Sequence, residues 1–452
     1  MKTTAQKYSA PKTWMQSALL LILLSACCGT AEAIDLDEVL AMAFKNDALH
    51  KSRLYEASAD RALGQQALFG YGPHISASAS YQLGRKDSVP DKEPEDSATT
   101  ATVPDEREAD FQQAELIFSL TQPVVDFEKF FLAQQGSADI STSELKRKQA
   151  VEDLILLIHE KYFALLIAEE NLALAKEECT TLKQQLDDAE QRLDLGYGII
   201  TDKENAQAKY ALSLAEKTAR QIERDSARIA LEEAVGIDFL ERIDDIPGDM
   251  KLPEFSKDLS YWQKTALKKN SGYNIALLQL KSARKRLHSR RSRFVPALNL
   301  FGSYNHTDTD MTLDGYGETN RETIAGLRLE MDLFASGRDT FDVIAASRQK
   351  KAAKKRVEAE KRHVLSTVEN IWDSLRNTLA LISSYKTAVE AAKVSMKSTE
   401  TGYLEGMYSL LDLLNVQQEY YRTMSQYKSA RYNYLHHRQN VPAATQNSPG
   451  SS

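Results

Sequence analysis

The sequence predicts a mainly α-helical protein in which very long coiled-coil helices alternate with two pairs of short β-strands. Three observations support this fold class. One spaced residue pattern occurs twice at a separation of 210 residues, long stretches contain no proline, and four segments of about ten residues alternate apolar and polar side chains. An internal repeat of this length indicates a duplicated structural unit. Each half of the chain should therefore contain one strand hairpin and a pair of long helices.

The repeated pattern marks a turn between two helices and the start of the second one. Its residues are Gly196, Asp202, Asn205, Gln207 and Tyr210 in the first copy, and Gly406, Asp412, Asn415, Gln417 and Tyr420 in the second. Upstream, apolar positions spaced by seven residues run from Leu165 to Leu193 and, in the same phase, from Leu375 to Tyr403. A seven-residue apolar repeat predicts helices that pack against neighbours as left-handed coiled coils.

The distribution of proline permits unusually long helices. No proline lies between Pro123 and Pro247, and none lies between Pro296 and Pro442. The helices expected in these stretches are about 127–195 and 201–234 in the first copy, and about 338–402 and 409–440 in the second. At a rise of about 1.5 Å per residue, the longest of them would reach on the order of 100 Å.

A helical pattern precedes each strand pair, from Leu36 to Phe69 and from Leu259 to Arg293. The expected strands are about 74–84, 112–122, 297–305 and 323–333, with polar loops at 85–110 and 306–322. A membrane-spanning strand needs about 9–11 residues, and a spanning sheet must close on itself. Four strands cannot enclose a pore, so spanning strands would require several chains to share one barrel. Alternation alone leaves open that the hairpins cap a soluble helical bundle.

The first 33 residues have the composition of a secretory signal. Three lysines precede the apolar run 18–24, which is too short to cross a membrane. Two processing sites compete, because Ala31-Glu32-Ala33 fits signal peptidase, whereas Leu24-Ser25-Ala26-Cys27 fits lipidation at Cys27. We favour the first, since the helical pattern begins directly afterwards. The expected organisation is a signal peptide (1–33), a first repeat (34–247), a second repeat (248–440) and a disordered tail (441–452).

Charge and chemistry exclude several functions. Removal of residues 1–33 takes away three lysines and one glutamate, so the net charge of −7 becomes −9, which disfavours nucleic-acid binding. Cys179 would remain as a single thiol in the apolar stripe, without a disulfide framework. His436-His437 is a weak metal motif without a cluster of further ligands. The basic run from Lys285 to Arg293 is interpreted as a solvated helix end near the membrane. We find no catalytic motif, and expect no enzyme, cofactor or metal.

The two turns carry recognisable helix-end signals. Gly196 and Gly406 suit the position after a helix where a left-handed residue is needed. Thr201-x-x-Glu204 predicts a capping box at the start of the next helix, and Ser409-x-x-Asp412 resembles one. Aspartates near a helix N-terminus are also favoured by the helix dipole. A purely structural interpretation of Asp202 and Asp412 therefore stands beside a functional one.

The sequence resembles the TolC-type outer-membrane efflux proteins over almost its whole mature length. The segments that carry the resemblance are Arg192–Tyr210 (RLDLGYGIITDKENAQAKY), Gly402–Asn415 (GYLEGMYSLLDLLN), Asp332–Arg338 (DLFASGR) and Ala430–Leu435 (ARYNYL). The resemblance implies a homotrimer with a shared twelve-stranded barrel in outer-membrane lipid and a helical tunnel across the periplasm. It further implies that the helical tips meet a periplasmic adaptor, coupled to an inner-membrane pump of the RND, ABC or MFS type.

The same resemblance assigns roles to residues at the tips. The residues matching Thr201, Asp202 and Tyr403 belong, in that family, to links that hold the tunnel entrance shut, and the residue matching Asp412 forms a three-fold acidic ring. The sequence departs from the family at two positions. Asn415 stands where a second aspartate is expected, and Tyr408 stands where an arginine of the lock is expected. The closed entrance should therefore be held by fewer charged contacts.

These expectations combine into one functional hypothesis. The chain would be a passive exit duct in the outer membrane of a Gram-negative bacterium, serving either a tripartite efflux system or type I protein secretion. The alternative from another class is a soluble periplasmic coiled-coil scaffold, which membrane fractionation would distinguish from a channel.

Overall fold

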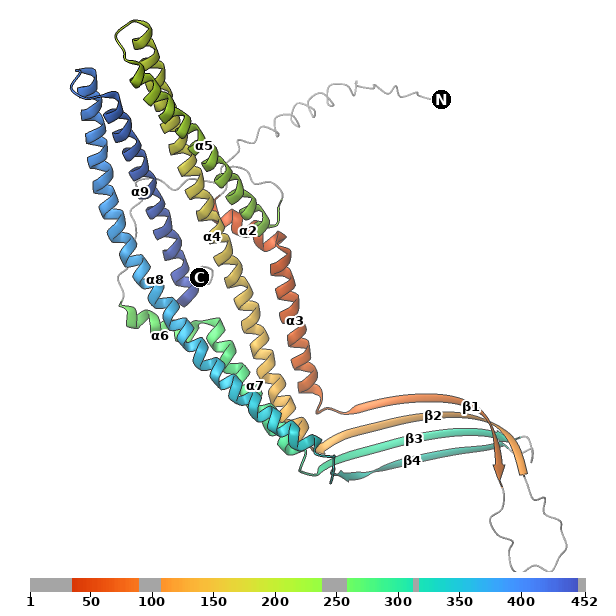
Figure 1. The fold of residues 1–452 in the computed structure, drawn as a ribbon. Coiled ribbons are helices and arrows are strands. Elements are labelled where there is room, and N and C mark those ends of the chain that lie inside the picture. Colours follow the sequence, from red (N-terminus) through yellow and green to blue (C-terminus); the bar gives the residue numbers. More distant parts are fainter. Residues whose placement is uncertain (1–34, 89–106, 238–257, 312–316, 446–452) are drawn as a thin grey trace, which may run out of the picture. The chain divides into compact units, whose positions relative to one another are not determined.

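The computed structural model describes residues 35–88, 107–237, 258–311 and 317–445 (Figure 1). The expected signal segment, with both processing sites and Cys27, lies outside the described residues. The described residues form eight helices and four strands, arranged twice in the same order as two shorter helices, two strands and two longer helices.

Four long helices dominate the fold. They are α4 (Phe127–Asp194, 68 residues), α5 (Ile200–Val235, 36 residues), α8 (Arg338–Leu404, 67 residues) and α9 (Leu410–Thr445, 36 residues). Most of the seven-residue stripe is buried as a coiled-coil core, with Leu172 on α4 and Leu375 on α8 at 4% and 0% exposure. Its members nearest the tips, Leu193 and Tyr403, are half-buried. Cys179 is a buried free thiol in the same stripe. The expected tail at 441–452 was too long, because α9 continues through Pro442 to Thr445.

Each expected N-terminal helix is in fact two helices. The first is divided into α2 (Leu36–Asn46) and α3 (Ala48–Phe69), and the second into α6 (Leu259–Lys269) and α7 (Ser271–Ser292). The break follows from a polar residue at each junction. The Asp47 carboxylate accepts hydrogen bonds from the backbone N–H of Leu49 and of His50, both at 2.9 Å, and the Asn270 side chain accepts one from Tyr273 N–H at 2.9 Å. Such side chains offer the backbone an alternative to the helical hydrogen bond and start a new helix.

The four strands form one antiparallel sheet in the order β1-β2-β3-β4. They are β1 (His74–Ser88), β2 (Arg107–Val125), β3 (Ala297–Met311) and β4 (Gly317–Glu330), and at 14–19 residues they are longer than expected. The loops expected at 85–110 and 306–322 were wrong at their ends. Polar cross-strand pairs such as Arg85 with Asp110 (2.9 Å) and Thr319 with Asp308 (3.1 Å) extend the ladder there. A search for apolar alternation does not detect such pairs.

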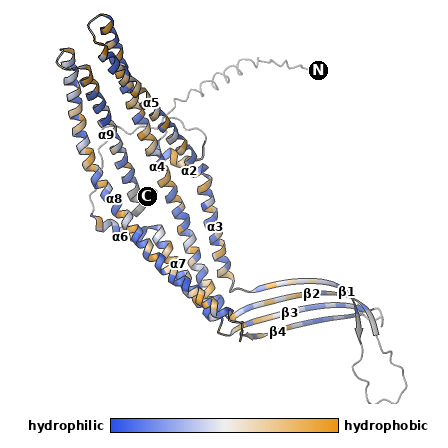
Figure 2. Cartoon of the chain, in the orientation of Figure 1, coloured by the Kyte–Doolittle hydropathy of each residue, from blue (hydrophilic) through white to orange (hydrophobic). Residues whose placement is uncertain are grey.

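Strand register gives the sheet two different faces. One row contains Ala77, Phe118 and Tyr304, and the adjacent row on the opposite face contains Ser76, Ser119 and Ser303. The apolar face is uncovered in the single chain, and Ile75 and Leu327 are 72% and 65% exposed. Figure 2 shows apolar and polar residues interspersed along the strands. An antiparallel sheet with one apolar and one polar face is typical of a wall between a nonpolar and an aqueous environment.

The chain divides into two compact units that both draw on the two repeats. The first unit combines residues 1–52, 150–269 and 364–452, and the second combines 53–149 and 270–363. The first unit is helical, and its largest core cluster surrounds Ile158, Leu231 and Val235, all fully buried. Within the described ranges, the helices include none with a run of apolar residues that would let it cross a membrane.

In the second unit, helices α3 and α4 cross at two glycines. A Cβ atom built on Gly136 would lie 2.4 Å from the carbonyl oxygen of Gly64, and one built on Gly64 would lie 3.0 Å from the carbonyl oxygen of Gly136. The distance of 2.4 Å is too short for any other residue at position 136 without movement of the backbone, and the distance of 3.0 Å is tighter than most Cβ contacts. The two glycines therefore set how closely the N-terminal helix approaches the long one.

Candidate functional site

The two helical hairpins of the first unit end in turns with the same geometry. Gly196 and Gly406 both have φ of 78°. The N–H of Gly196 donates to Leu193 O and that of Gly406 to Tyr403 O, both at 3.0 Å, while the next residue in each turn donates to the carbonyl of Arg192 or Gly402. This is the left-handed helix end expected from the sequence, and its positive φ favours glycine at both positions.

The helices that follow the two turns begin differently. Ser409 and Asp412 form a reciprocal capping box, because Asp412 N–H donates to Ser409 Oγ at 3.2 Å and Ser409 N–H donates to Asp412 Oδ2 at 3.1 Å. The Ser409 hydroxyl also donates to Oδ2, at 2.6 Å. The box expected at Thr201 and Glu204 was wrong. Helix α5 begins at Ile200 after the extended residue Ile199, which has no side-chain cap. Thr201 therefore lies inside the first turn, where its hydroxyl cannot cap that end.

Asp412 thus has a structural role at the tip. Hydrogen bonds from the Ser409 side chain and backbone lower the pKa of the exposed Asp412 carboxyl, so that the group stays ionised in mild acid. Asn415, three residues further along α9, is also exposed. A ring formed by these two residues would require further copies of the chain, and it remains a prediction.

Tyr403 occupies a contact between the two hairpins. It is half-buried on α8 against an apolar cluster from α4, α5 and α9 that includes Leu182, Ala206 and Leu414. The Arg192 guanidinium lies 5.0 Å from the centroid of the Tyr403 ring. Burial raises the pKa of the Tyr403 hydroxyl, with Arg192 acting in the opposite direction and the nearby Asp202 carboxylate adding to the rise.

The other expected gate residues do not form a hydrogen-bonded lock in the single chain. Among the described residues, Asp202 and Tyr403 have no hydrogen bond to each other, and Thr201 is exposed. The Tyr408 ring packs against its own turn, because a Cβ atom on Gly402 would lie 2.5 Å from Tyr408 Cδ2. Tyr408 is 50% exposed. The roles of these residues in closing an entrance therefore remain predictions.

Above the tips, side chains on α9 connect the second hairpin to the first. Lys209 on α5 donates to Gln418 Oε1 at 2.8 Å, and the hydroxyls of Thr181 and Tyr421 are 3.1 Å apart. Further from the tip, Ser425 donates to Asn171 Oδ1 at 2.6 Å, and Lys428 pairs with Glu170. These contacts form a ladder along the hairpins. They show that the first unit packs its two repeats together through polar as well as apolar side chains.

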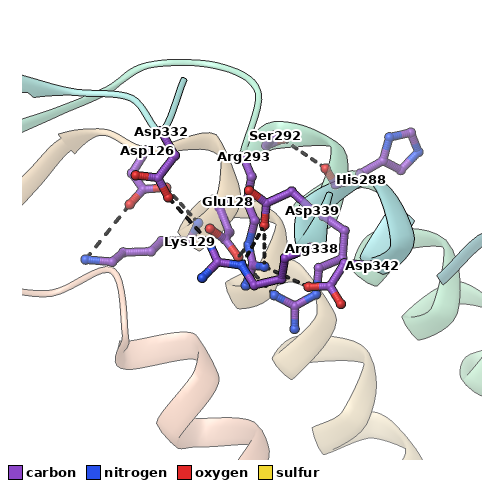
Figure 3. A network of polar contacts seen from close by, with 11 residues as sticks. Asp126, Glu128, Lys129, His288, Ser292, Arg293, Asp332, Arg338, Asp339 and Asp342 are labelled. Carbon is purple, nitrogen blue, oxygen red and sulfur yellow. Dashed lines mark hydrogen bonds and ion pairs between the residues drawn. The ribbon is translucent and has the colours of Figure 1, made fainter. Parts of the chain in front are cut away.

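A second cluster lies in the other unit, where the strands meet the helices (Figure 3). Arg293, at the end of α7, donates to Glu128 Oε1 at 2.7 Å, to Asp339 Oδ1 at 3.2 Å and to Asp342 Oδ2 at 2.8 Å. The basic run of which it is part was interpreted as a solvated helix end. That interpretation was wrong for Arg293, whose side chain is 25% exposed, and for Arg290, which also pairs with Glu128.

Sequence reasoning missed the acidic partners of this cluster. Glu128 and Asp339 lie in the first turns of α4 and α8, where acids are favoured by the helix dipole. Each is the second residue of its long helix, and this shared position in the two repeats could have indicated that the two acids have a common partner. Arg338, from the DLFASGR motif, donates to Asp339 at 3.2 Å and to Asp332 at 3.4 Å. The motif therefore joins the end of the sheet to the start of α8.

A buried histidine, His159, lies inside the helical unit near the half-buried His436. His159 on α4 is 9% exposed, and its pKa is lowered to about 4 by burial, with a further contribution from the neighbouring His436 on α9. Burial also lowers the pKa of His436 and that of His437. Within the described part of the chain, histidine, cysteine and acidic side chains form no group suited to a metal ion.

Three features together define a class of membrane channel. They are two repeats with the same order of helices and strands, one sheet with an apolar and a polar face, and matching helical tips. The sequence model of the family described as outer membrane efflux protein matches residues 45–237 and 262–445. The chain belongs to this family. It is an outer-membrane channel protein, mainly α-helical with a membrane β-portion, of the kind used in efflux and type I secretion.

Individual relatives extend over nearly the whole chain. The alkaline protease secretion protein AprF of Pseudomonas aeruginosa is 26% identical, with 94% of this chain and 86% of AprF covered. The outer membrane protein TolC of Vibrio cholerae is 25% identical, with 92% of both chains covered. Among solved structures, a membrane protein from Pseudomonas aeruginosa has a TM-score of 0.77 at 16% identity, with 92% of both chains covered. The open state of the MtrE channel of Neisseria gonorrhoeae has a TM-score of 0.71 at 16% identity, with 91% and 88% covered.

Proposed function

We propose that three copies of this chain form one passive exit duct, to which each copy contributes four strands of a twelve-stranded barrel. The observation that supports the trimer most strongly is the sheet. Its outer strands β1 and β4 each have one partner strand within the chain, and its two faces differ in polarity. A spanning sheet with open edges is unstable in lipid. Joining β4 of one copy to β1 of the next removes those edges.

The helical tips form the periplasmic entrance of the duct. Thr201, Asp202, Tyr403 and Tyr408 hold it closed, and Asp412 with Asn415 forms a polar ring around its axis. The tips also present apolar side chains at the two turns, including Tyr197 at 87% and Met407 at 68% exposure. These side chains suit contact with a periplasmic adaptor, while an inner-membrane pump supplies the energy. The chain itself has no catalytic role and needs no cofactor.

The cargo includes secreted polypeptide. Two relatives that cover 94% and 93% of this chain are named for protease secretion, AprF of Pseudomonas aeruginosa and PrtF of Dickeya chrysanthemi. Expression in a strain that lacks its own secretion channel tests this assignment. Restored export of a protease substrate supports it. Restored drug resistance without protease export would limit the duct to small-molecule efflux.

The trimer is tested by separating membranes and cross-linking the intact cells. A cross-linked species of three chains in the outer-membrane fraction is expected. Pairs of cysteines introduced at exposed positions on β1 and β4, such as Ala79 and Thr323, should join neighbouring chains. Recovery of the protein as a soluble monomer after osmotic release of the periplasm would contradict the duct and favour a periplasmic scaffold.

A further inference from the structure

We infer that Arg192 is a positioning residue of the entrance, and that its guanidinium on the face of the Tyr403 ring holds the second hairpin against the first. This inference rests on the proposed function, because it concerns the gate of the same duct. It assigns the cationic part of the lock to a residue of the first hairpin, in place of the arginine that this sequence lacks at position 408.

The contact joins elements that are far apart in sequence. Arg192 lies in the last turn of α4, and Tyr403 lies in the last turn of α8. The guanidinium carbon is 5.0 Å from the ring centroid, within the range of a cation–π interaction. The polar contacts of the ladder described above reach α9. Arg192 instead reaches α8, the helix whose C-terminal end carries the second tip turn.

The surroundings favour the ring as the partner of this cation. Among the residues that the structure describes, no carboxylate lies within ion-pair distance of the Arg192 guanidinium, although Asp188 and Asp202 both act electrostatically on Tyr403. The Tyr403 ring is held in place by the apolar cluster of Leu182, Ala206 and Leu414. A fixed ring with acidic groups near its hydroxyl is a favourable surface for a planar cation, and arginine stacks on such rings better than lysine does.

Position 408 does not supply an equivalent cation. The Tyr408 ring is packed on the Cα of Gly402, so it stabilises its own turn. Lys203, in the first turn of α5, provides a matched cation on the first hairpin. It pairs with Glu190 on the same hairpin at 3.4 Å, and this pair joins α5 to α4 without reaching the second hairpin. Lys203→Gln therefore removes a positive charge from the tip without removing a contact between the hairpins.

The test is single-channel recording of the purified full-length protein in planar lipid bilayers. One exposed cation–π contact shifts an equilibrium by a factor of about 2–5. Each copy of the chain contains one such contact, so Arg192→Gln should shift the closed–open equilibrium towards the open state by about that factor for each copy. Arg192→Lys should have an intermediate effect, and Lys203→Gln should match the wild type. Tyr403→Phe keeps the ring and should stay near the wild type, whereas Tyr403→Leu should match Arg192→Gln.

The outcomes separate this inference from the proposed function. If the wild type forms channels and the Arg192→Gln variant has the same open probability, the inference is overturned while the duct stands. An effect of Tyr403→Phe as large as that of Tyr403→Leu would assign the link to the hydroxyl and also overturn it. A wild type that forms no channels would contradict the duct itself. In that case the contact is still tested by thermal unfolding, which compares the stability of the Arg192→Gln, Tyr403→Leu and double variants with that of the wild type. Coupled effects support the contact, and additive effects overturn it.

Discussion

Arg293 at the end of α7 donates a hydrogen bond of 2.7 Å to Glu128 at the start of α4, and so connects the two repeats directly beside the sheet. The same guanidinium also contacts Asp339 and Asp342 on α8. Three helix ends are therefore tied to one side chain. One partly buried guanidinium therefore stabilises the junction between these helices and the sheet.

The first prediction concerns this cluster. Arg293→Met should destabilise the protein by about 1–3 kcal/mol, because hydrogen bonds to charged groups contribute about 1.5–3 kcal/mol and the side chain is partly solvated. The measurement is the thermal midpoint of the purified protein. The matched control is Arg338→Met, which also contacts Asp339 but has a side chain that is 62% exposed. Its effect should stay below about 1 kcal/mol, and equal effects of the two variants would show that Arg293 is an ordinary surface residue.

The second prediction concerns the two helix starts at the tips. Ser409→Ala should destabilise the start of α9 by about 0.5–2 kcal/mol, since it removes the side chain that caps Asp412 N–H. Thr201→Ala should leave the start of α5 unchanged, because Thr201 does not cap it. Amide hydrogen exchange of the first turn of each helix measures the difference. Faster exchange after both substitutions, or after neither, would refute this assignment of the caps.

The third prediction concerns pH and the charge of Asp412. Hydrogen bonds from Ser409 lower the pKa of the Asp412 carboxyl. Its contribution to stability is thus present above the pKa of the unfolded state and is lost as pH falls through the lower folded-state pKa. In the trimer, the same ionised groups should favour cations in the pore. The cation preference, measured from reversal potentials, should weaken as the pH falls and these carboxylates become protonated.

Two substitutions separate the ring from the cap. Asp412→Asn keeps a side-chain oxygen that can accept the hydrogen bonds from Ser409, and it removes the charge. It should retain trimer stability while abolishing both cation preference and block by trivalent cations. Ser409→Ala should instead raise the pH at which the preference is lost. A channel that stays cation-selective after Asp412→Asn would show that Asp412 acts only as a helix cap.

The fourth prediction concerns the buried histidine. The pKa of His159 is lowered from 6.5 to about 4, chiefly by burial. The folded state therefore resists protonation that the unfolded state accepts, and stability should fall as the pH decreases from about 6.5 towards 4. His159→Leu should remove part of this slope. The measurement is the thermal midpoint of the wild type and of His159→Leu at several pH values. If the midpoint falls equally with pH in both proteins, other groups cause the acid sensitivity.

The fifth prediction concerns the crossing of α3 and α4. Gly136→Ala should destabilise the protein by about 1–3 kcal/mol, because its Cβ would meet the Gly64 carbonyl at 2.4 Å and the helices would have to separate. Gly317→Ala is the control, since the nearest atom to its added Cβ would be Thr309 O at an ordinary 3.6 Å. Thermal unfolding of both variants makes the comparison. Tolerance of both alanines would indicate that the two glycines do not limit the approach of the helices.

Much of this fold could be predicted because its determinants repeat locally. The glycine turns at 196 and 406, the seven-residue stripe and the proline-free stretches are periodic signals that need no knowledge of distant contacts. The breaks at Asp47 and Asn270 were missed because the apolar pattern continues through them, and only the side-chain hydrogen bonds reveal a new helix start. The strand ends were missed because polar pairs such as Arg85 with Asp110 have no apolar period.

The candidate site was less predictable for a physical reason. Arg293 and Glu128 are 165 residues apart, and Arg192 and Tyr403 are 211 apart, so neither pair leaves a local pattern. Their meeting depends on how the repeats pack. The resemblance predicted that Asp202 and Tyr403 both belong to the links that close the entrance. The structure shows the Tyr403 ring facing Arg192, a contact that the spacing of the motif did not suggest.

We propose above that three copies of this chain form a duct closed at its helical tips. Single-channel conductance in planar bilayers tests it most directly, with the wild type compared against a variant that combines Asp202→Ala and Tyr403→Leu. We expect stable small-conductance channels from the wild type and a several-fold larger conductance from the variant, with the trimer preserved in both. The absence of channels in the wild type, or the same conductance in both proteins, would contradict it.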